Sequence, residues 1–346
     1  MQDFNWKKLQ NGSDIRGVAV EGVPNEPVNL TPEIVQFLGQ AFTTWLAQKL
    51  GKPTTALQMA VGRDSRVSGP VLMQGVMDGM ASLGASVYDV GMASTPAMFM
   101  STVTSGFDCD GAIMMTASHL PFNRNGLKFF TAQGGLGKPD ISEILALAEQ
   151  NNFPKEAMAG SITVRDFIST YAEQLVQKIR TAVNHPHHFE QPLQGLKIIV
   201  DAGNGAGGFY ASKVLEPLGA DTTGSQFLDP DGMFPNHIPN PEDSAAMASI
   251  CQAVLAHKAD FGIIFDTDVD RSAAVDHQGQ ELNRNRLIAL ISAIVLQEHP
   301  GSTIVTDSIT SDGLTQFIEQ TLQGNHHRFK RGYKNVITEA VRLNQT

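Results

Sequence analysis

The chain has 346 residues and a formal net charge of −10, which is enough material for two or three domains with buried cores. An acidic surface repels nucleic acids and anionic membranes, so neither is expected as a partner. Two cysteines, Cys109 and Cys251, cannot build a disulfide framework or a cysteine zinc site. Because no segment resembles a signal peptide or a membrane span, a cytoplasmic protein is expected.

The N-terminal part of the chain predicts alternating helices and strands. Thr31 can cap a helix that has Pro32 at its first position and ends at Gly51. The next expected elements are a strand over 56–61, a helix over 70–83 and a strand over 86–90. The same strand–loop–helix order returns over residues 196–218 and 303–322. This recurrence predicts related α/β units in series.

The predicted fold class is α/β, with serial three-layer domains and mixed, mostly parallel sheets. The expected domains are 1–160, 161–283 and a partial third domain over 284–346. In such sheets ligands collect at the carboxyl ends of the strands. Two groups of histidines lack further ligands at a fixed spacing and are expected in solvated loops: His185, His187 and His188, and His326 with His327.

A serine stands at the carboxyl end of a predicted buried strand over 111–115. The loop that follows contains Ser118 and His119, and a second strand is expected over 127–130. Arg124 and Lys128 add positive charge, which a phosphoserine of about −1.5 to −2 charges requires. The alternatives are a solvated serine in a polar loop or a serine hydrolase, although the Gly-x-Ser-x-Gly motif of hydrolases is absent here.

Three aspartates follow another apolar strand, which ends at Phe265. Asp266, Asp268 and Asp270 would alternate between faces in a regular strand, but a loop around a cation lets them converge. A set of carboxylate ligands favours Mg²⁺, Mn²⁺ or Ca²⁺ over zinc or copper. An EF-hand is excluded because Arg271 occupies the position of the turn glycine. The remaining alternative is a solvated acidic loop.

Two other motifs support competing hypotheses. The segment 203–208 satisfies Gly-x-Gly-x-x-Gly and has Asp221 downstream, which is typical of a nucleotide-dependent oxidoreductase. However, Asp201 begins that loop, where a carboxylate would face the pyrophosphate. Asp266 and Asp268 after an apolar strand also resemble the opening motif of phosphatases that use an aspartate nucleophile. Both hypotheses stay open at the level of sequence.

Taken together, these segments resemble the α-D-phosphohexomutase superfamily, the phosphoglucomutases and phosphomannomutases. Residues 116–128 are similar to the phosphoserine loop of the family, and residues 266–271 to its metal loop. Residues 14–17 are similar to its N-terminal motif, and residues 62–66 to a loop of its first domain. The order of the motifs also agrees with the family. The resemblance therefore implies a phosphohexomutase-like fold.

The resemblance implies a role for each candidate site residue. The metal loop and the serine would bind one Mg²⁺ per chain through Asp266, Asp268, Asp270 and Ser118. The implied catalytic residues are the carrier Ser118 with Lys128, Arg16 and His119. Substrate or phosphate binding is implied for Arg271, Arg63, Asn125, Gly332, Tyr333 and Lys334. For Arg63, pairing with Asp64 is an equally good interpretation.

The implied reaction interconverts hexose 1-phosphate and hexose 6-phosphate, with glucose or mannose as the hexose. Phosphoserine donates its phosphoryl group, and hexose 1,6-bisphosphate is the intermediate and activator. The second sugar-contacting loop and the fourth domain of the family are not found before Thr346. The chain is therefore expected to be a fragment of a longer enzyme. The alternative is a fragment that binds sugar phosphates, or a protein partner, without turnover.

Overall fold

The computed structural model describes residues 4–153, 158–282 and 284–344, without the side chains of residues 333 and 334. The chain forms two compact units, Met1–Gly279 and Gln280–Thr346. Within the described residues, no helix is both long enough and apolar enough to cross a lipid bilayer.

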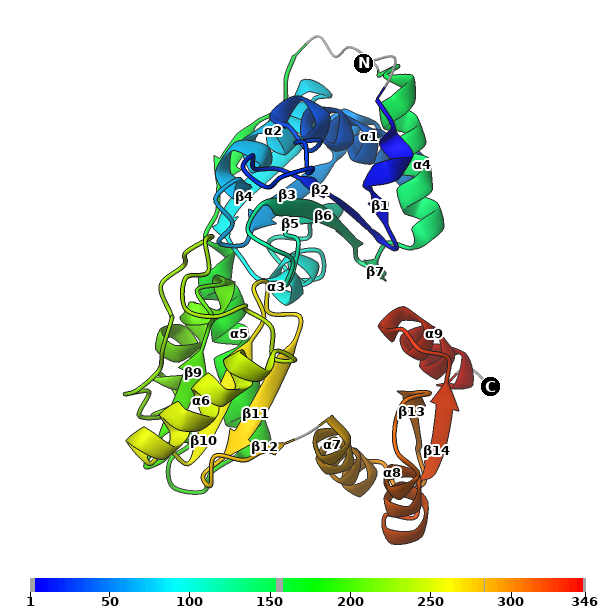
Figure 1. Cartoon of the computed structure of the whole chain (residues 1–346). Coiled ribbons are helices and arrows are strands. Elements are labelled where there is room, and N and C mark those ends of the chain that lie inside the picture. Colours follow the sequence, from blue (N-terminus) through cyan, green and yellow to red (C-terminus); the bar gives the residue numbers. More distant parts are fainter. Residues whose placement is uncertain (1–3, 154–157, 283, 345–346) are drawn as a thin grey trace. The chain divides into compact units, whose positions relative to one another are not determined.

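The first part of Met1–Gly279 contains a mixed sheet of eight strands (Figure 1), with the order β1-β2-β6-β5-β3-β4-β8 and β7 paired to β6. Its strands are β1 (Gln10–Asn11), β2 (Asp14–Val18), β3 (Gln58–Arg63), β4 (Ser86–Met92), β5 (Gly111–Met115), β6 (Arg124–Thr131), β7 (Gly134–Gly135) and β8 (Ile162–Val164). Strands β5, β3, β4 and β8 run parallel, whereas β1, β2, β6 and β7 pair antiparallel. This sheet sets the serine loop between two adjacent antiparallel strands.

Helices cover both faces of this sheet because both faces are apolar. One core joins the sheet to α1 (Pro32–Leu50), α2 (Gly69–Ser82), α4 (Lys138–Gln150) and the short η1 (Trp6–Leu9). The other core joins it to α3 (Thr95–Met100) and α5 (Phe167–Val183). The short η2 (Thr54–Ala56) precedes β3. The result is the three-layer arrangement that the alternating pattern predicts.

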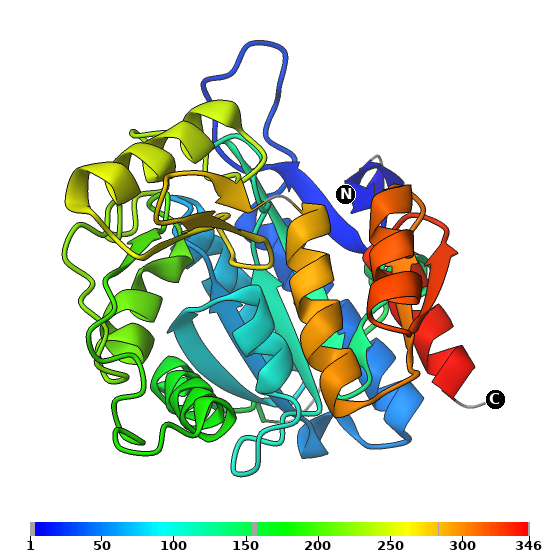
Figure 2. The ribbon, with the colours of Figure 1, turned by 90° about the horizontal axis from the view of Figure 1, so that it is seen from below.

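A second, smaller sheet follows in the same unit, and Figure 2 shows it from another side. Strand β9 (Ile198–Asp201) is parallel to β10 (Phe261–Phe265), which is antiparallel to β11 (Ser272–Asp276). Helix α6 (Ser244–His257) packs on one face. The short η3 (Ala206–Gly208) and the π-helical η4 (Tyr210–Leu215) pack on the other. The aspartate loop leaves this sheet at the carboxyl end of β10.

The unit Gln280–Thr346 contains a short parallel pair, β13 (Thr303–Asp307) with β14 (Asn325–Phe329). Its other elements are β12 (Glu281–Leu282), α7 (Arg284–Glu298), α8 (Asp312–Gln316), the π-helical η5 (Phe317–Thr321) and α9 (Tyr333–Asn344). Leu296, Leu314 and Ile318 form its small buried core.

Most expected elements are confirmed, and the differences have local causes. Thr31 caps α1 and Gly51 ends it at φ 63°, as expected. The helix expected over 209–218 is instead a π-helical segment, in which the Glu216 amide bonds the Ala211 carbonyl. Apolar spacing does not separate that wider turn from an α-helix.

Two expectations about loops were wrong. His326 and His327 lie in β14 rather than in a solvated loop. His326 bonds the hydroxyls of Thr306 and Thr315, each at 2.8 Å. The second strand of the serine hairpin also begins earlier than expected, at Arg124. Residues 185–188 do lie in an irregular loop, as expected.

Candidate functional site

The site forms where the serine loop after β5 meets the aspartate loop after β10. Ser118 Oγ lies 3.0 Å from Asp266 Oδ2, although 148 residues separate them. Both residues are fully buried. Ser118 adopts φ 53°, an uncommon conformation for a residue with a side chain, and its amide bonds the Thr116 hydroxyl at 2.8 Å. The two loops therefore face each other as the sequence predicts.

The aspartate loop curls so that its three carboxylates converge. Oxygens of Asp266, Asp268 and Asp270 all lie within 4.8 Å of one another. Val269, at φ 65°, turns the chain between the last two aspartates. Asp268 Oδ1 is buried and has no hydrogen-bond partner among the described residues. An oxygen-only set with an unsatisfied buried carboxylate oxygen fits a hard divalent cation.

Two residues of the first sheet and its helices hold these carboxylates. Lys128 Nζ, on β6, lies 2.7 Å from Asp268 Oδ2 and 2.6 Å from Asp270 Oδ2. Thr95, at the start of α3, donates its hydroxyl to Asp268 Oδ2, and its amide bonds the Asp268 carbonyl at 2.8 Å. These contacts fix the aspartate loop against the sheet that carries the serine.

The close carboxylates change one another's protonation. Burial and the neighbouring charges of Asp268 and Asp270 raise the pKa of Asp266 to about 9. Burial opposes ionisation of Asp268 too, but the Lys128 ammonium group outweighs it and lowers the pKa of Asp268. In return, although burial opposes it, Asp268 and Asp270 raise the pKa of Lys128. Without a further cation, one carboxylate of the cluster is therefore held protonated.

Arg271 and His119 complete the surroundings of the serine hydroxyl. Arg271 Nη2 donates to Ser118 Oγ at 3.0 Å and lies 2.9 Å from His119 Nδ1. His119 Nδ1 is also 3.4 Å from Ser118 Oγ. Burial, Arg271 and Arg16 lower the pKa of His119. A neutral imidazole and a guanidinium thus flank the hydroxyl.

Other predicted residues lie in the same unit with different contacts. Arg16 donates to the carbonyl of Ala117, the residue before the serine, at 2.7 Å and pairs with Asp14 at 2.8 Å. Arg63 donates to the backbone carbonyl of Asp64 at 3.1 Å. The contact of Arg63 with Asp64 is thus made to the backbone and not to the carboxylate. That carboxylate lies 3.3 Å from Arg66 Nε.

Of the remaining predicted residues, the structure describes Asn125 and Gly332 but not the side chains of Tyr333 and Lys334. Asn125 is buried on β6, and its amide donates to the Ser68 hydroxyl at 2.9 Å. The side chains of Tyr333 and Lys334 lie outside the described residues. Gly332 precedes α9 in the second unit at φ 121°. The substrate-binding roles of these residues remain predictions.

Two residues that hold the site were not identified from the sequence. Thr95 is the first residue of α3, after the capping residue Ser94 and the strand β4. The start of that helix was the available signal in the sequence. Arg66 lies in the recognised loop 62–66 but was not singled out. Its side chain is fully buried and contacts the serine loop.

The Gly-rich loop 203–208 has a structural explanation. A Cβ at Gly205 would lie 2.6 Å from the Thr267 carbonyl oxygen, and one at Gly208 would lie 2.2 Å from the Leu228 carbonyl oxygen. The Asp201 carboxylate accepts from the Gly203 amide at 2.9 Å and from other groups of the same region. The glycines thus make room for neighbouring backbone, including the aspartate loop, without any nucleotide.

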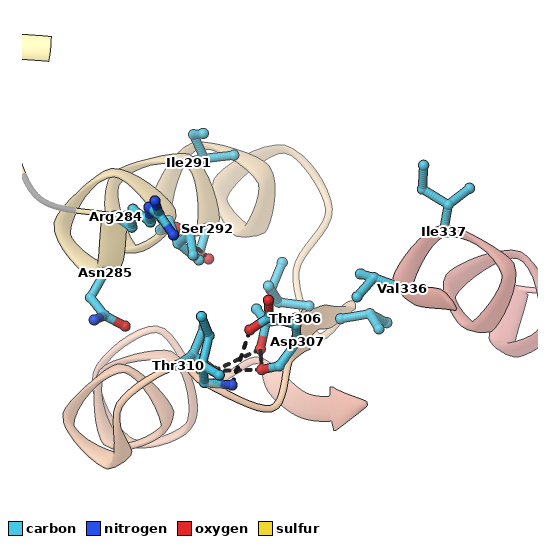
Figure 3. Close-up of a pocket in the computed structure, with 13 residues that line it drawn as sticks. Arg284, Asn285, Ile291, Ser292, Thr306, Asp307, Thr310, Val336 and Ile337 are labelled. Atoms are coloured by element: carbon cyan, nitrogen blue, oxygen red, sulfur yellow. Dashed lines mark hydrogen bonds between the residues drawn. The ribbon is translucent and has the colours of Figure 1, made fainter. Parts of the chain in front are cut away.

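The second unit has a cavity of about 520 Å³ between α7, β13 and α9, shown in Figure 3. Its lining is mostly apolar. The polar residues Thr306 and Thr310 bond each other at 2.9 Å, and both hydroxyls reach the Asp307 carbonyl. Arg284, Asn285, Ser292 and Asp307 supply the other polar groups of the lining.

A buried serine facing converged carboxylates on α/β sheets is typical of proteins that transfer phosphoryl groups with a divalent cation. Residues 7–155 match the family model for domain I of phosphoglucomutase/phosphomannomutase, an alpha/beta/alpha domain. Residues 169–279 match the model for domain II of the same family. The chain belongs to this family, within the α-D-phosphohexomutase superfamily.

Individual relatives agree with this assignment. The chain is 31% identical over 308 residues to a phosphoglucomutase of Neisseria gonorrhoeae, covering 89% of this chain and 61% of the relative. It is 34% identical over 297 residues to a phosphoglucomutase/phosphomannomutase of Thermococcus kodakarensis, covering 85% and 61%. The structure of a family protein from Burkholderia thailandensis matches with a TM-score of 0.80 and 27% identity, covering 97% of this chain and 68% of that one. The chain thus spans about three fifths of the length of these sequence relatives.

Proposed function

We propose that this chain carries the phosphoserine and metal sites of a phosphohexomutase that interconverts hexose 1-phosphate and hexose 6-phosphate. The observation that supports this most is the 3.0 Å contact between Ser118 Oγ and Asp266 Oδ2, beside three converged carboxylates. Glucose and mannose phosphates are the proposed substrates, with hexose 1,6-bisphosphate as intermediate and activator. The proposed domains are 1–160, 161–283 and a partial third over 284–346.

Asp266, Asp268 and Asp270 are the proposed ligands of Mg²⁺, together with an oxygen of Ser118. The bound ion would neutralise charge on the phosphoryl group and make its phosphorus a better electrophile. The unsatisfied Asp268 Oδ1 and the raised pKa of Asp266 are the features that favour a cation here. Both features support the proposal of a cation at this cluster.

In the proposed transfer, a hydroxyl oxygen of the hexose phosphate attacks the phosphorus of phosphoserine. The bond from Ser118 Oγ to phosphorus breaks with its electron pair left on Oγ, and the proton lost by the sugar hydroxyl ends on Oγ, which gives a serine hydroxyl and the hexose bisphosphate. After the bisphosphate reorients, its other phosphoryl group is transferred to Ser118 Oγ, which restores phosphoserine and releases the isomerised hexose phosphate. Arg271, which donates to Ser118 Oγ, is placed to stabilise the serine oxygen as it takes up charge.

Lys128, Arg16 and His119 have supporting roles in this proposal. The raised pKa of Lys128 keeps it protonated beside Asp268 and Asp270, which suits charge stabilisation better than acceptance of a proton. Arg16 holds the backbone at Ala117. His119, whose pKa is lowered, is the neutral base nearest the serine hydroxyl. Arg63, Asn125, Gly332, Tyr333 and Lys334 remain proposed contacts to phosphate or sugar.

A turnover assay with a matched variant tests the proposal. Glucose 1-phosphate, Mg²⁺ and a catalytic amount of glucose 1,6-bisphosphate are supplied to the chain and to Ser118→Ala. The proposal predicts formation of glucose 6-phosphate by the chain and none by the variant. Equal rates would remove Ser118 from the mechanism. If neither protein turns over but both bind the sugar phosphate, the non-catalytic alternative is favoured.

A further inference from the structure

Arg66 is among the largest fully buried side chains of the described molecule, although it carries a charge. Burying an arginine is costly unless all its donors are used. Its carboxylate partner is Asp64, whose Oδ2 forms an ion pair with Arg66 Nε at 3.3 Å but no hydrogen bond, and whose Oδ1 accepts from the Arg66 amide at 3.0 Å. That pair fixes the base of the side chain and leaves both terminal nitrogens directed elsewhere.

The terminal nitrogens bind the backbone of the serine loop. Nη1 donates to the carbonyls of Pro121 and Arg124, at 2.7 and 2.9 Å. Nη2 donates to the carbonyls of Ser118 and Leu120, the latter at 2.6 Å. One rigid guanidinium thus ties four carbonyls between residues 118 and 124. A lysine cannot reproduce this fork.

An irregular segment between η4 and α6 covers the side chain of Arg66. The ring of Phe234 lies over the guanidinium, 5.3 Å from its carbon. Phe234 adopts φ 51°, which is unusual for an aromatic residue. Close by, Gly232 packs so tightly that a Cβ would lie 2.4 Å from the Val67 amide nitrogen. The segment 232–234 therefore contacts the Arg66 loop directly and excludes water from one side.

We propose that Arg66 is a positioning residue that holds Ser118 in its left-handed conformation and directs Oγ at the aspartate loop, with Phe234 as its cover. The four carbonyl bonds compensate for the strain of φ 53° at Ser118. Because the segment 232–234 and the aspartate loop both belong to residues 169–279, the part of the chain that forms the second sheet and its surroundings, this contact also couples the two loops. The expected effect of Arg66 on catalysis rests on the proposed phosphoserine function, whereas its expected effect on the order of the serine loop does not.

The experiment uses the full chain with Arg66→Lys and Phe234→Leu. Arg165→Lys is the matched control, since Arg165 also lies over aromatic rings, those of Tyr88 and Phe107. Hydrogen exchange of the amides in 117–126 is measured by mass spectrometry without any ligand. Both test variants should exchange there about tenfold faster or more, whereas α1 and the control should not change.

In a second arm, the rate of phosphorylation by glucose 1,6-bisphosphate with Mg²⁺ is followed by intact mass. Arg66→Lys should lower the saturating rate by about 10- to 100-fold and leave the half-saturating concentration within about threefold. Unchanged exchange in both test variants would overturn the inference. A saturating rate equal to that of the unsubstituted chain in both Arg66→Lys and Phe234→Leu would also overturn it. If the unsubstituted chain takes up no phosphoryl group, the proposed function fails, and the exchange result still decides the role of Arg66 in ordering the loop.

Discussion

At the scale of single residues, the protonation of Asp266 links the site to pH. Burial and two neighbouring carboxylates raise its pKa to about 9, so near neutral pH the folded chain holds a proton that the unfolded chain has lost. Protonation of Asp266 therefore stabilises the folded chain at low pH. This contribution to the free energy of unfolding is lost as the pH rises from the pKa of Asp266 in the unfolded chain through about 9. A divalent cation needs the ionised carboxylate and must displace that proton.

We therefore expect Mg²⁺ to bind more tightly as the pH rises from 6.5 to 8.5, by up to about tenfold per pH unit, with release of a proton. Calorimetry in buffers of different ionisation enthalpy measures both quantities. Asp266→Asn should bind more weakly and lose the pH dependence. An affinity that is constant over this range, with no proton released, would show that Asp266 is already ionised.

At the scale of elements, the Gly-rich loop 203–208 supports the aspartate loop by close backbone contact. The Ala206 amide bonds the Thr267 carbonyl at 2.8 Å, and a Cβ at Gly205 would lie 2.6 Å from that same oxygen. No flexible side chain is present at that contact to move aside. The backbone between Asp266 and Asp268 would have to shift instead.

Gly205→Ala should therefore weaken Mg²⁺ binding at least about tenfold and destabilise the chain by about 1–3 kcal/mol, as overpacking does. The matched control is Gly313→Ala in α8, where the nearest atom to a Cβ is 3.8 Å away. The control should keep its Mg²⁺ affinity and gain up to about 1 kcal/mol in the free energy of unfolding. Calorimetry and urea unfolding measure the two effects. Equal Mg²⁺ affinity in both variants would contradict the supporting role.

The sequence predicted those elements whose signals are local. Thr31, Pro32 and Gly51 mark the ends of α1 by capping chemistry alone. Asp266, Asp268 and Asp270 were recognisable because three carboxylates after an apolar strand need a cation. By contrast, the π-helical η4 and the position of His326 in β14 depend on the groups that these residues bond in the folded chain. Apolar spacing contains no record of those partners.

The same distinction holds inside the site. The meeting of Ser118 with Asp266 was expected because the family resemblance implies that the serine and the three aspartates bind one Mg²⁺. The buried fork of Arg66 was not predicted, since its four acceptors are backbone carbonyls that any sequence could supply. Thr95 was missed because nothing in the sequence near it indicates its partner Asp268, which is 173 residues away.

At the scale of the whole molecule, one unit, Met1–Gly279, supplies all the described groups of the serine and aspartate loops. The domain I sheet carries the serine and Lys128, and the domain II sheet carries the aspartates. Contacts such as Thr95 with Asp268 and Phe234 with Arg66 join the two sheets. We infer that this joined pair of sheets is the phosphoryl-carrying part of the enzyme.

The chemical nature of the phosphorylated residue tests this account most directly. The chain is incubated with radiolabelled glucose 1,6-bisphosphate and Mg²⁺, then treated with acid or with hydroxylamine and mapped by mass spectrometry. We predict one label on Ser118 that survives both treatments and is absent from Ser118→Ala. A label that hydroxylamine removes and that maps to Asp266 would contradict the account and identify an aspartate nucleophile instead.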